Sequence, residues 1–214
     1  MKSKESSRNS SLRSLSLGMA AASLMFAGAA AAQTSQAGQT WQLVGVNARL
    51  DHAVDTNSAT QGQAVEAKLD GSVTTDQGKK LEKGTELTGT VTAIEKSANG
   101  GASSLTLSFT TAKTKDGKEI PVKVTLLSAF PASAENAAAY GLGEVGSVPR
   151  HVKSDEKIDQ ESGMLNNISL HSRVQGENSG TFMKKDGDLK LNAGTYLQVG
   201  IASMNANTAN SGGN

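Results

Sequence analysis

The sequence predicts an all-β protein, built as a small antiparallel β-barrel or a barrel-like sandwich of about seven to nine strands. Three observations favour this class. Apolar and polar residues alternate in several runs between residues 43 and 202, which places one set of side chains on each face of a strand. Those runs are rich in Thr and Val, and Asn-Gly or Asp-Gly pairs separate them. We therefore expect residues 43–202 to form one β domain.

Residues 1–32 have the pattern of a secretory signal peptide. A basic start with four Lys and Arg residues precedes a run of small and apolar residues that ends in Ala30-Ala31-Ala32. The run is short and rich in Ala, a poor composition for a membrane anchor. We expect cleavage near residue 32 and a periplasmic or secreted bacterial protein without a membrane span, with an uncleaved anchor as the alternative. Residues 33–42 are polar and form an expected flexible lead-in.

Residues 85–96, 103–113 and 118–128 predict a three-stranded antiparallel meander. In each run, apolar side chains alternate with mostly polar ones. Asn99-Gly100 lies between the first two runs and Asp116-Gly117 between the last two. Such pairs tolerate the positive φ that tight hairpin turns require.

The pattern breaks over residues 131–165, which are rich in Gly and small side chains. We expect a long loop insertion there, with residues 154–157 resembling a helix start because acidic residues suit the positive end of a helix dipole. Alternation returns at Ile168, and the domain closes near residue 202. Residues 203–214 consist mainly of Asn, Ala, Thr, Ser and Gly, so we expect a disordered tail.

One phrase occurs twice. Residues 81–91 and 191–201 both read L-x-x-G-T-x-L-x-x-x-[VI]. The Gly permits a tight turn, and the chain enters a strand at the Thr. The two copies are either equivalent strands of one barrel or a coincidence, since Gly-Thr before a strand is common in β proteins.

The order of these motifs resembles a known family. A G-x-x-V-x-A strand at 62–67 is followed by L-x-x-G-T-x-L-x-G at 81–89, an apolar strand at 105–109, Asp116-Gly117, and a closing strand at 194–201. This order is similar to the β-barrel domain of the TrbI-like proteins of conjugation and type IV secretion machines. The similarity covers roughly residues 46–201, apart from 131–165. The sequence is also similar to uncharacterised exported proteins of soil bacteria.

The resemblance implies a β-barrel fold. Proteins of the TrbI-like family also have an uncleaved inner-membrane helix, a Pro-rich linker and an apolar helical hairpin. This chain has only three Pro, and its insertion is polar and rich in Gly. We therefore carry over the fold and leave a channel or energy-transducing role as an alternative, because fold alone does not fix function.

Composition excludes several functions. Removing residues 1–32 takes away four of the 21 basic and one of the 20 acidic residues, which leaves a formal charge of −2. A slightly acidic chain is a poor binder of nucleic acid. Aromatic residues make up only 3%, so stacking platforms for ligands are scarce. The chain has no Cys, which excludes disulfides, thiol catalysis and Cys-based zinc sites.

The candidate chemical residues are few. None of the three His residues (His52, His151 and His171) has a second His three or four positions away, so no local metal pair is present. The densest acidic cluster comprises Asp155, Glu156, Asp159 and Glu161. We favour a solvated loop, in which Lys153 and Lys157 balance the acidic charge, with a calcium site or a carboxylate pair as the alternative. No nucleophile elbow of the G-x-S-x-G type occurs. We therefore assign no catalytic, cofactor-binding or metal-binding residue and expect no cofactor.

These observations favour an exported non-catalytic β-domain that acts as a cell-envelope scaffold or interaction module. Its partner would be an envelope protein, bound by a sheet edge or by the 131–165 loop. Two alternatives stay open. One is a subunit of a secretion or conjugation channel. The other is an exported hydrolase whose carboxylates assemble in the fold near the 131–165 loop.

Overall fold

The computed structural model describes residues 41–132, 149–152, 156–165 and 167–204. The expected signal peptide and most of the expected tail lie outside these residues. Among the described residues all regular structure is β-strand and no helix occurs. A helix long and apolar enough to span a membrane is therefore not found among them. The strands are β1 (Trp41–Leu50), β2 (Val54–Asp55), β3 (Ala64–Leu69), β4 (Val73–Thr74), β5 (Lys80–Leu81), β6 (Glu86–Glu95), β7 (Ser103–Lys113), β8 (Glu119–Phe130), β9 (Pro149–Val152), β10 (Lys157–Leu165), β11 (Ile168–Arg173), β12 (Gly180–Lys184), β13 (Lys190–Leu191) and β14 (Tyr196–Ser203).

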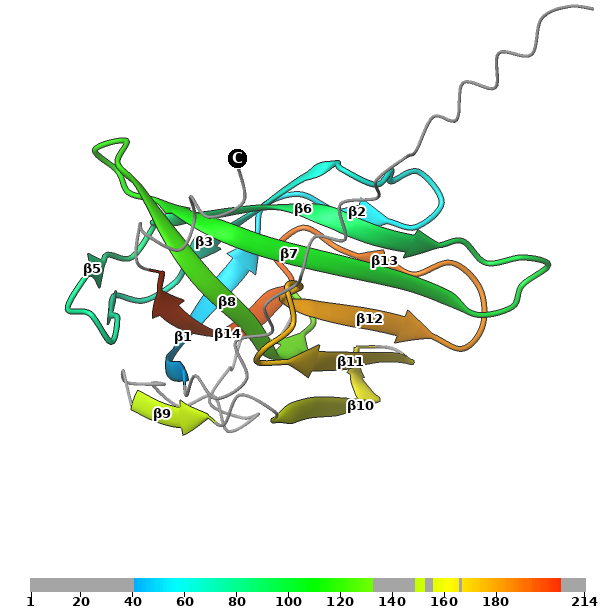
Figure 1. Cartoon of the computed structure of the whole chain (residues 1–214). Helices are drawn as coiled ribbons and strands as arrows, with labels where there is room; N and C mark the ends of the chain where they lie inside the picture. Colours follow the sequence, from blue (N-terminus) through cyan, green and yellow to red (C-terminus); the bar gives the residue numbers. More distant parts are fainter. Residues whose placement is uncertain (1–40, 133–148, 153–155, 166, 205–214) are drawn as a thin grey trace, which may run out of the picture. The chain divides into compact units, whose positions relative to one another are not determined.

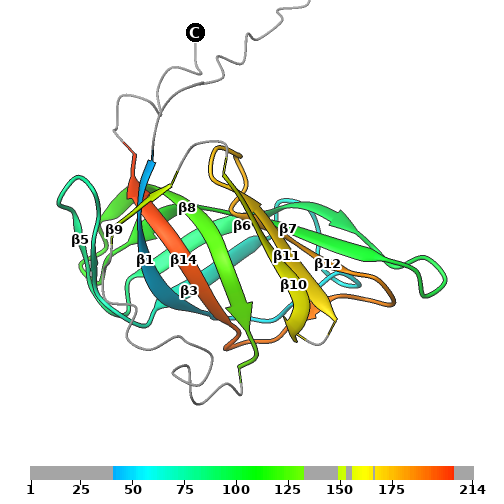
Figure 2. The same cartoon turned by 90° about the horizontal axis from the view of Figure 1, so that it is seen from below.

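Six strands close into an antiparallel barrel, which confirms the predicted fold class. Around the ring they follow the order β7, β6, β3, β1, β14 and β8, and β8 pairs with β7 again. Figures 1 and 2 show the barrel from two directions. Strands β12, β11 and β10 continue from β7 outside the ring, and we call these three strands the extension. Strand β9 pairs with β1.

The predicted meander is present as β6, β7 and β8, with bounds within two residues of those expected. Its turns use the residues that the sequence indicated. Asn99 and Gly100 have φ of 53° and 77°, and Gly117 has φ of 82°. The Asn-Gly and Asp-Gly pairs therefore set the register of the sheet through their backbone freedom.

The two copies of the L-x-x-G-T phrase occupy equivalent places in the barrel. The N–H of Gly84 donates to the carbonyl of Leu69, at the end of β3 (2.7 Å), and Leu69 donates back to Thr85. The N–H of Gly194 donates to the carbonyl of Leu50, at the end of β1, with the same length, and Leu50 donates back to Thr195. Coincidence does not reproduce two reciprocal hydrogen bonds, so the equivalence is structural.

A second repeat accompanies the first. Residues 46–51 and 65–70 share the pattern V-x-A-[RK]-L-D, and they pair antiparallel with Arg49 directly opposite Lys68. A pseudo-two-fold axis through this pair relates one half of the barrel (β1, β2, β13, β14 and β8) to the other (β3 to β7). Each half contains a register shift at the matching place, between Gln198 and Val199 and between Thr88 and Gly89.

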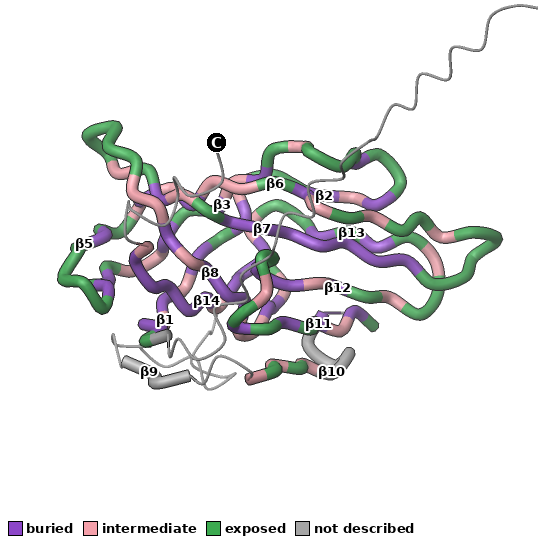
Figure 3. Tube along the Cα trace, viewed as in Figure 1, coloured by how far each residue is buried: buried purple, intermediate pink, exposed green. Residues whose placement is uncertain are grey.

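The barrel interior is filled with aliphatic side chains. Figure 3 shows β7 buried along most of its length, and the inward residues of the other barrel strands are buried as well. Close packing of these side chains leaves the inside of the barrel as a core. The largest fully buried side chains are Phe182, Leu43, Leu50, Leu69, Leu81, Leu87, Leu105, Leu107, Leu126, Leu170, Leu189 and Leu191.

The extension covers a gap between β7 and β8. These two strands pair through only three residue pairs, from Thr111 opposite Pro121 to Lys113 opposite Glu119. Farther along, Ser179 bridges them: its N–H donates to Leu107 and its carbonyl accepts from Leu126. The extension also contacts β8, so it completes the barrel wall.

Part of the expected loop insertion forms strands, which corrects the prediction for residues 131–165. Residues 149–152 form β9 and residues 157–165 form β10, and Lys157 begins a strand instead of a helix. The inward side of β10 carries Gln160, whose side-chain amide donates to the carbonyl of Ala129 and accepts from its N–H. A polar residue in an inward position hides the alternation on which the prediction depended. Strand β1 likewise begins at Trp41, inside the expected lead-in.

Candidate functional site

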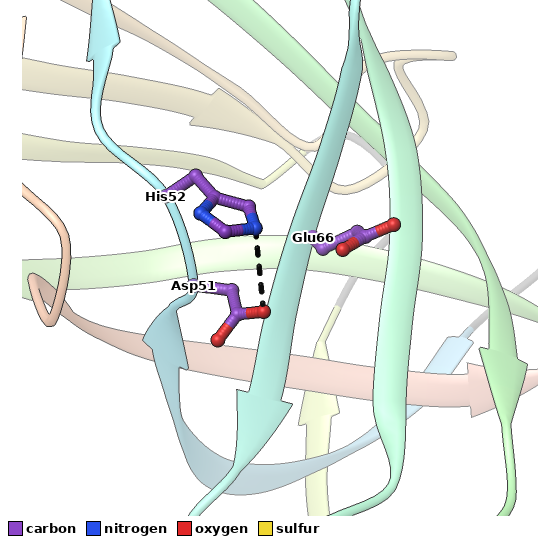
Figure 4. Close-up of side chains that lie close together, drawn as sticks. All are labelled: Asp51, His52 and Glu66. Atoms are coloured by element: carbon purple, nitrogen blue, oxygen red, sulfur yellow. Dashed lines mark ion pairs between the residues drawn. The ribbon is translucent and has the colours of Figure 1, made fainter.

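Three potential metal ligands meet at the end of β1. Asp51 and His52 follow β1, and Glu66 lies on the neighbouring strand β3 (Figure 4). One ligand atom from each residue lies within 4.8 Å of the other two. Imidazole and carboxylate groups of this kind suit zinc and related divalent cations.

Lys68 already forms an ion pair with one carboxylate of this cluster. Its Nζ lies 2.9 Å from both carboxylate oxygens of Asp51. The hydrogen bond from Lys68 lowers the pKa of Asp51, and the same bond raises the pKa of Lys68. The side chain of His52 is 81% exposed and its Nε2 lies 3.7 Å from Asp51. A cation at this place would compete with Lys68, so the geometry favours only loose coordination.

The matching positions of the other half of the barrel hold no such cluster. Asp70 corresponds to Asp51, but Gly71 stands in place of His52 and Asn47 in place of Glu66. Asp70 forms ion pairs with Arg49 at 2.8 Å and with Lys83 at 3.7 Å. Both Asp residues therefore serve the barrel as partners of the cations across β1 and β3.

A second polar group lies on the outer face of the extension. Asp159 of β10 lies opposite His171 of β11, and Asp159 Oδ1 is 2.7 Å from His171 Nδ1. The other ring nitrogen, Nε2, is 3.1 Å from the hydroxyl of Ser169. This order of Asp, His and Ser atoms is the order that activates a serine nucleophile in hydrolases.

The surroundings of Ser169 lack the other half of a hydrolase site. Ser169 lies in β11, between β10 and β12, so the sheet ladder uses the backbone N–H groups that an oxyanion pocket needs. The Ser169 hydroxyl is also 3.4 Å from the Met183 carbonyl, to which it donates. The side chains of His171 and Asp159 are 44% and 58% exposed, which leaves the pair in contact with water.

A cleft of about 420 Å³ adjoins this group. Lys157, Arg173 and Thr181 line it together with Asp159 and His171. Lys157 lies directly opposite Arg173 across β10 and β11, and among the described residues neither has an ion-pair partner. Like charges in directly opposite positions destabilise a sheet, so this pair calls for a function or a counterion.

A half-buried cation, Lys123, supports one wall of the cleft. Lys123 of β8 donates a hydrogen bond to the carbonyl of Gly176, and Gly176 lines the cleft. Burial lowers the pKa of Lys123 to about 8, and nearby Glu177 offsets part of this effect. Lys123 therefore holds the turn after β11 against the barrel.

The sequence candidates are distributed unevenly over these groups. His52 and His171 each belong to one of them, and of the acidic cluster only Asp159 has a described place in one. Asp155 and the side chains of His151 and Glu161 lie outside the described residues. Glu66 was missed because only the pairing of β1 with β3 places it beside Asp51 and His52. Ser169 was missed although it stands two residues before His171 on the same strand, a spacing that puts both side chains on one face.

No protein-family model matches the chain, and no curated protein matches it either.

Proposed function

We propose that this protein is an exported, non-catalytic β-domain that serves as a scaffold or interaction module of the bacterial cell envelope. The extension (β10, β11 and β12) is its contact surface. Export is supported by the signal-peptide pattern of residues 1–32.

One observation carries the choice of surface. The two halves of the barrel repeat the same hydrogen bonds around a filled interior, so the barrel serves as a rigid frame. The extension belongs to one half only, and in the described part of the chain β10 pairs only with β11. An open strand edge can accept a further strand from a partner. Among the described residues, the large hydrophobic side chain that is exposed is that of Met183, and it also lies on the extension.

Site-specific photo-crosslinking in the producing cells tests this proposal. A photoreactive phenylalanine analogue replaces Met183 on the extension, and Lys115 or Glu119 at the β7–β8 turn as the matched control. We expect an adduct of one defined mass from the extension position and none from the turn. The absence of adducts, or equal adducts from both places, contradicts the proposal.

A second candidate function is ester hydrolysis, favoured by the hydrogen-bonded Asp159, His171 and Ser169. In that reaction Ser169 Oγ would attack the ester carbonyl while its proton passes to His171 Nε2. The ester C–O bond would then break, the alcohol would leave with that proton, and water would hydrolyse the acyl-serine to release the acid and regenerate Ser169. The purified protein and its Ser169→Ala variant are compared on p-nitrophenyl acetate. The proposed function requires equal rates. A drop of about a hundredfold or more in the variant favours the hydrolase.

A further inference from the structure

We infer that the partner binds through an extended acidic segment, whose backbone pairs with the open edge of β10 and whose carboxylates meet Lys157 and Arg173. This inference deepens the proposed function and rests on it. It follows from three features of the extension: a pair of cations with no ion-pair partner among the described residues, the cleft beside them, and the direction of the β10 backbone groups that no described strand pairs.

The barrel itself supplies a control for the cation pair. Arg49 and Lys68 also lie directly opposite each other on neighbouring strands. There the chain provides a carboxylate for each of them, Asp70 at 2.8 Å and Asp51 at 2.9 Å. In the barrel, two cations in this arrangement are therefore each neutralised by a carboxylate of the same chain.

Lys157 and Arg173 occupy the same arrangement, and no carboxylate of the described residues forms an ion pair with either of them. Among the described side chains that line the cleft, Asp159 is the one carboxylate, and its Oδ1 lies 2.7 Å from His171 Nδ1. The planar fork of Arg binds a carboxylate through two hydrogen bonds, and the Lys ammonium adds a point charge. A carboxylate from outside completes the pair in the way that Asp51 and Asp70 complete the other one.

The backbone of β10 identifies the ligand as a polypeptide. The N–H of Val174 donates to the carbonyl of Glu156, so Glu156, Ile158 and Gln160 direct their backbone groups toward β11. By alternation, the backbone groups of Lys157 and Asp159 point away from β11, toward the edge of β10 with which no described strand pairs. A free anion uses none of these groups, whereas an extended peptide pairs with them and places alternate side chains over the cleft.

The cleft has room for such side chains. Its volume of about 420 Å³ lies in the range of pockets that hold small ligands. Thr181 lines the cleft, and its hydroxyl shares a hydrogen bond with the Thr106 hydroxyl at 3.0 Å, so it can donate to a ligand when Thr106 donates to it. Asn178 also lines the cleft; its Oδ1 accepts from Thr92 at 2.8 Å, and its NH₂ group donates to no described residue. These donors suit carboxylate oxygens better than apolar groups.

Peptide binding to the purified protein tests the inference. The probe is a fluorescein-labelled ten-residue peptide that alternates Glu with Val, and a peptide with Gln in place of Glu is its control. Fluorescence anisotropy is measured for the wild type, for the double variant Lys157→Gln and Arg173→Gln, and for the control variant Lys113→Gln. All substituted side chains are exposed, and equal thermal melts confirm that the variants fold.

We expect the Glu peptide to bind about tenfold more weakly to the double variant, with no change for Lys113→Gln, and to bind less tightly as salt is raised. The inference is overturned if the Glu and Gln peptides bind equally, if neither binds, or if inorganic phosphate alone binds as tightly as the Glu peptide.

The crosslinking experiment separates this inference from the proposed function. If cellular adducts from Met183 persist in the double variant, the acidic segment is wrong and the contact surface stands. If the Glu peptide binds as expected and no adduct forms in cells, the site stands and the proposed function is wrong.

Discussion

Arg49 and Lys68 lie directly opposite each other across β1 and β3, and each forms its ion pair with the Asp that ends the other strand's motif. The exchange places both cations and both carboxylates around the pseudo-two-fold axis of the barrel. The charged row on the outside of β1 and β3 is thus a structural part of the repeat.

The pairing predicts a low pKa for Asp51. The hydrogen bond from Lys68 lowers that pKa below the ordinary value of 3.8. A lowered carboxyl pKa stabilises the fold above the unfolded-state pKa, and this contribution is lost as pH falls through the folded-state value. We expect Lys68→Met to raise the Asp51 pKa toward its ordinary value in an NMR titration of side-chain carboxyls. The variant Lys80→Met should leave it unchanged, and an unaltered Asp51 titration in Lys68→Met contradicts the pairing.

The register shift in β6 predicts that Gly89 tolerates no side chain. A Cβ at this position would lie 2.0 Å from the carbonyl oxygen of Ser108 and 2.7 Å from the Cα of Phe109. Backbone atoms cannot move aside cheaply, so we expect Gly89→Ala to lower the free energy of unfolding by roughly 3 kcal/mol or more. Gly71→Ala is the control, because its Cβ would meet only Val46 at 3.7 Å. Urea unfolding of both variants measures the difference, and equal midpoints disagree with the register described for β6 and β7.

The sequence predicted the barrel strands well where each strand buries one face. The alternation of Leu87 and Val91 with Thr residues appears in the structure as buried and less buried positions of β6. The L-x-x-G-T phrase proved to be one part of a longer repeat. The accompanying pattern V-x-A-[RK]-L-D was not predicted as a repeat, because its two copies differ at the basic position, which is Arg49 in one and Lys68 in the other.

The extension and the sites could be predicted only in part. Strand β10 is an edge strand whose inward Gln160 bonds to the backbone of Ala129, so no apolar period marks it. Asp51 and Glu66 are brought together by strand pairing, and so are Asp159 and His171. Sequence separation conceals such contacts until the topology is known.

Lys123 predicts a rise in stability at alkaline pH. Burial lowers its pKa to about 8 from the ordinary 10.5, so between these values the unfolded chain binds a proton that the folded chain does not. The contribution of Lys123 to the free energy of unfolding therefore rises with pH across that interval, by roughly 3 kcal/mol in total. Below pH 8 this contribution is constant. We expect the free energy of unfolding of the wild type, measured relative to Lys123→Met, to increase from pH 8 to pH 10. The exposed Lys113→Met variant should show no such difference from the wild type, and parallel curves for Lys123→Met and the wild type would show that the pKa of Lys123 is not lowered.

The hydrogen bonds of Ser179, the residue just before β12, predict how strongly the extension holds the barrel closed. Its hydroxyl accepts the N–H of Phe109 at 2.9 Å, and its carbonyl accepts the N–H of Leu126 at the same distance. Phe109 and Leu126 are equivalent positions of the two halves, so one residue joins the halves where β7 and β8 no longer pair. Ser179→Ala leaves the buried Phe109 N–H without its acceptor, which costs about 1–3 kcal/mol. The exposed Ser58→Ala should change stability by less than about 0.5 kcal/mol. Hydrogen exchange distinguishes a local from a global effect: we expect the Phe109 amide to exchange faster in Ser179→Ala by more than the loss of global stability explains. If that amide exchanges no faster than the loss of global stability requires, Ser179 does not bridge the gap between β7 and β8.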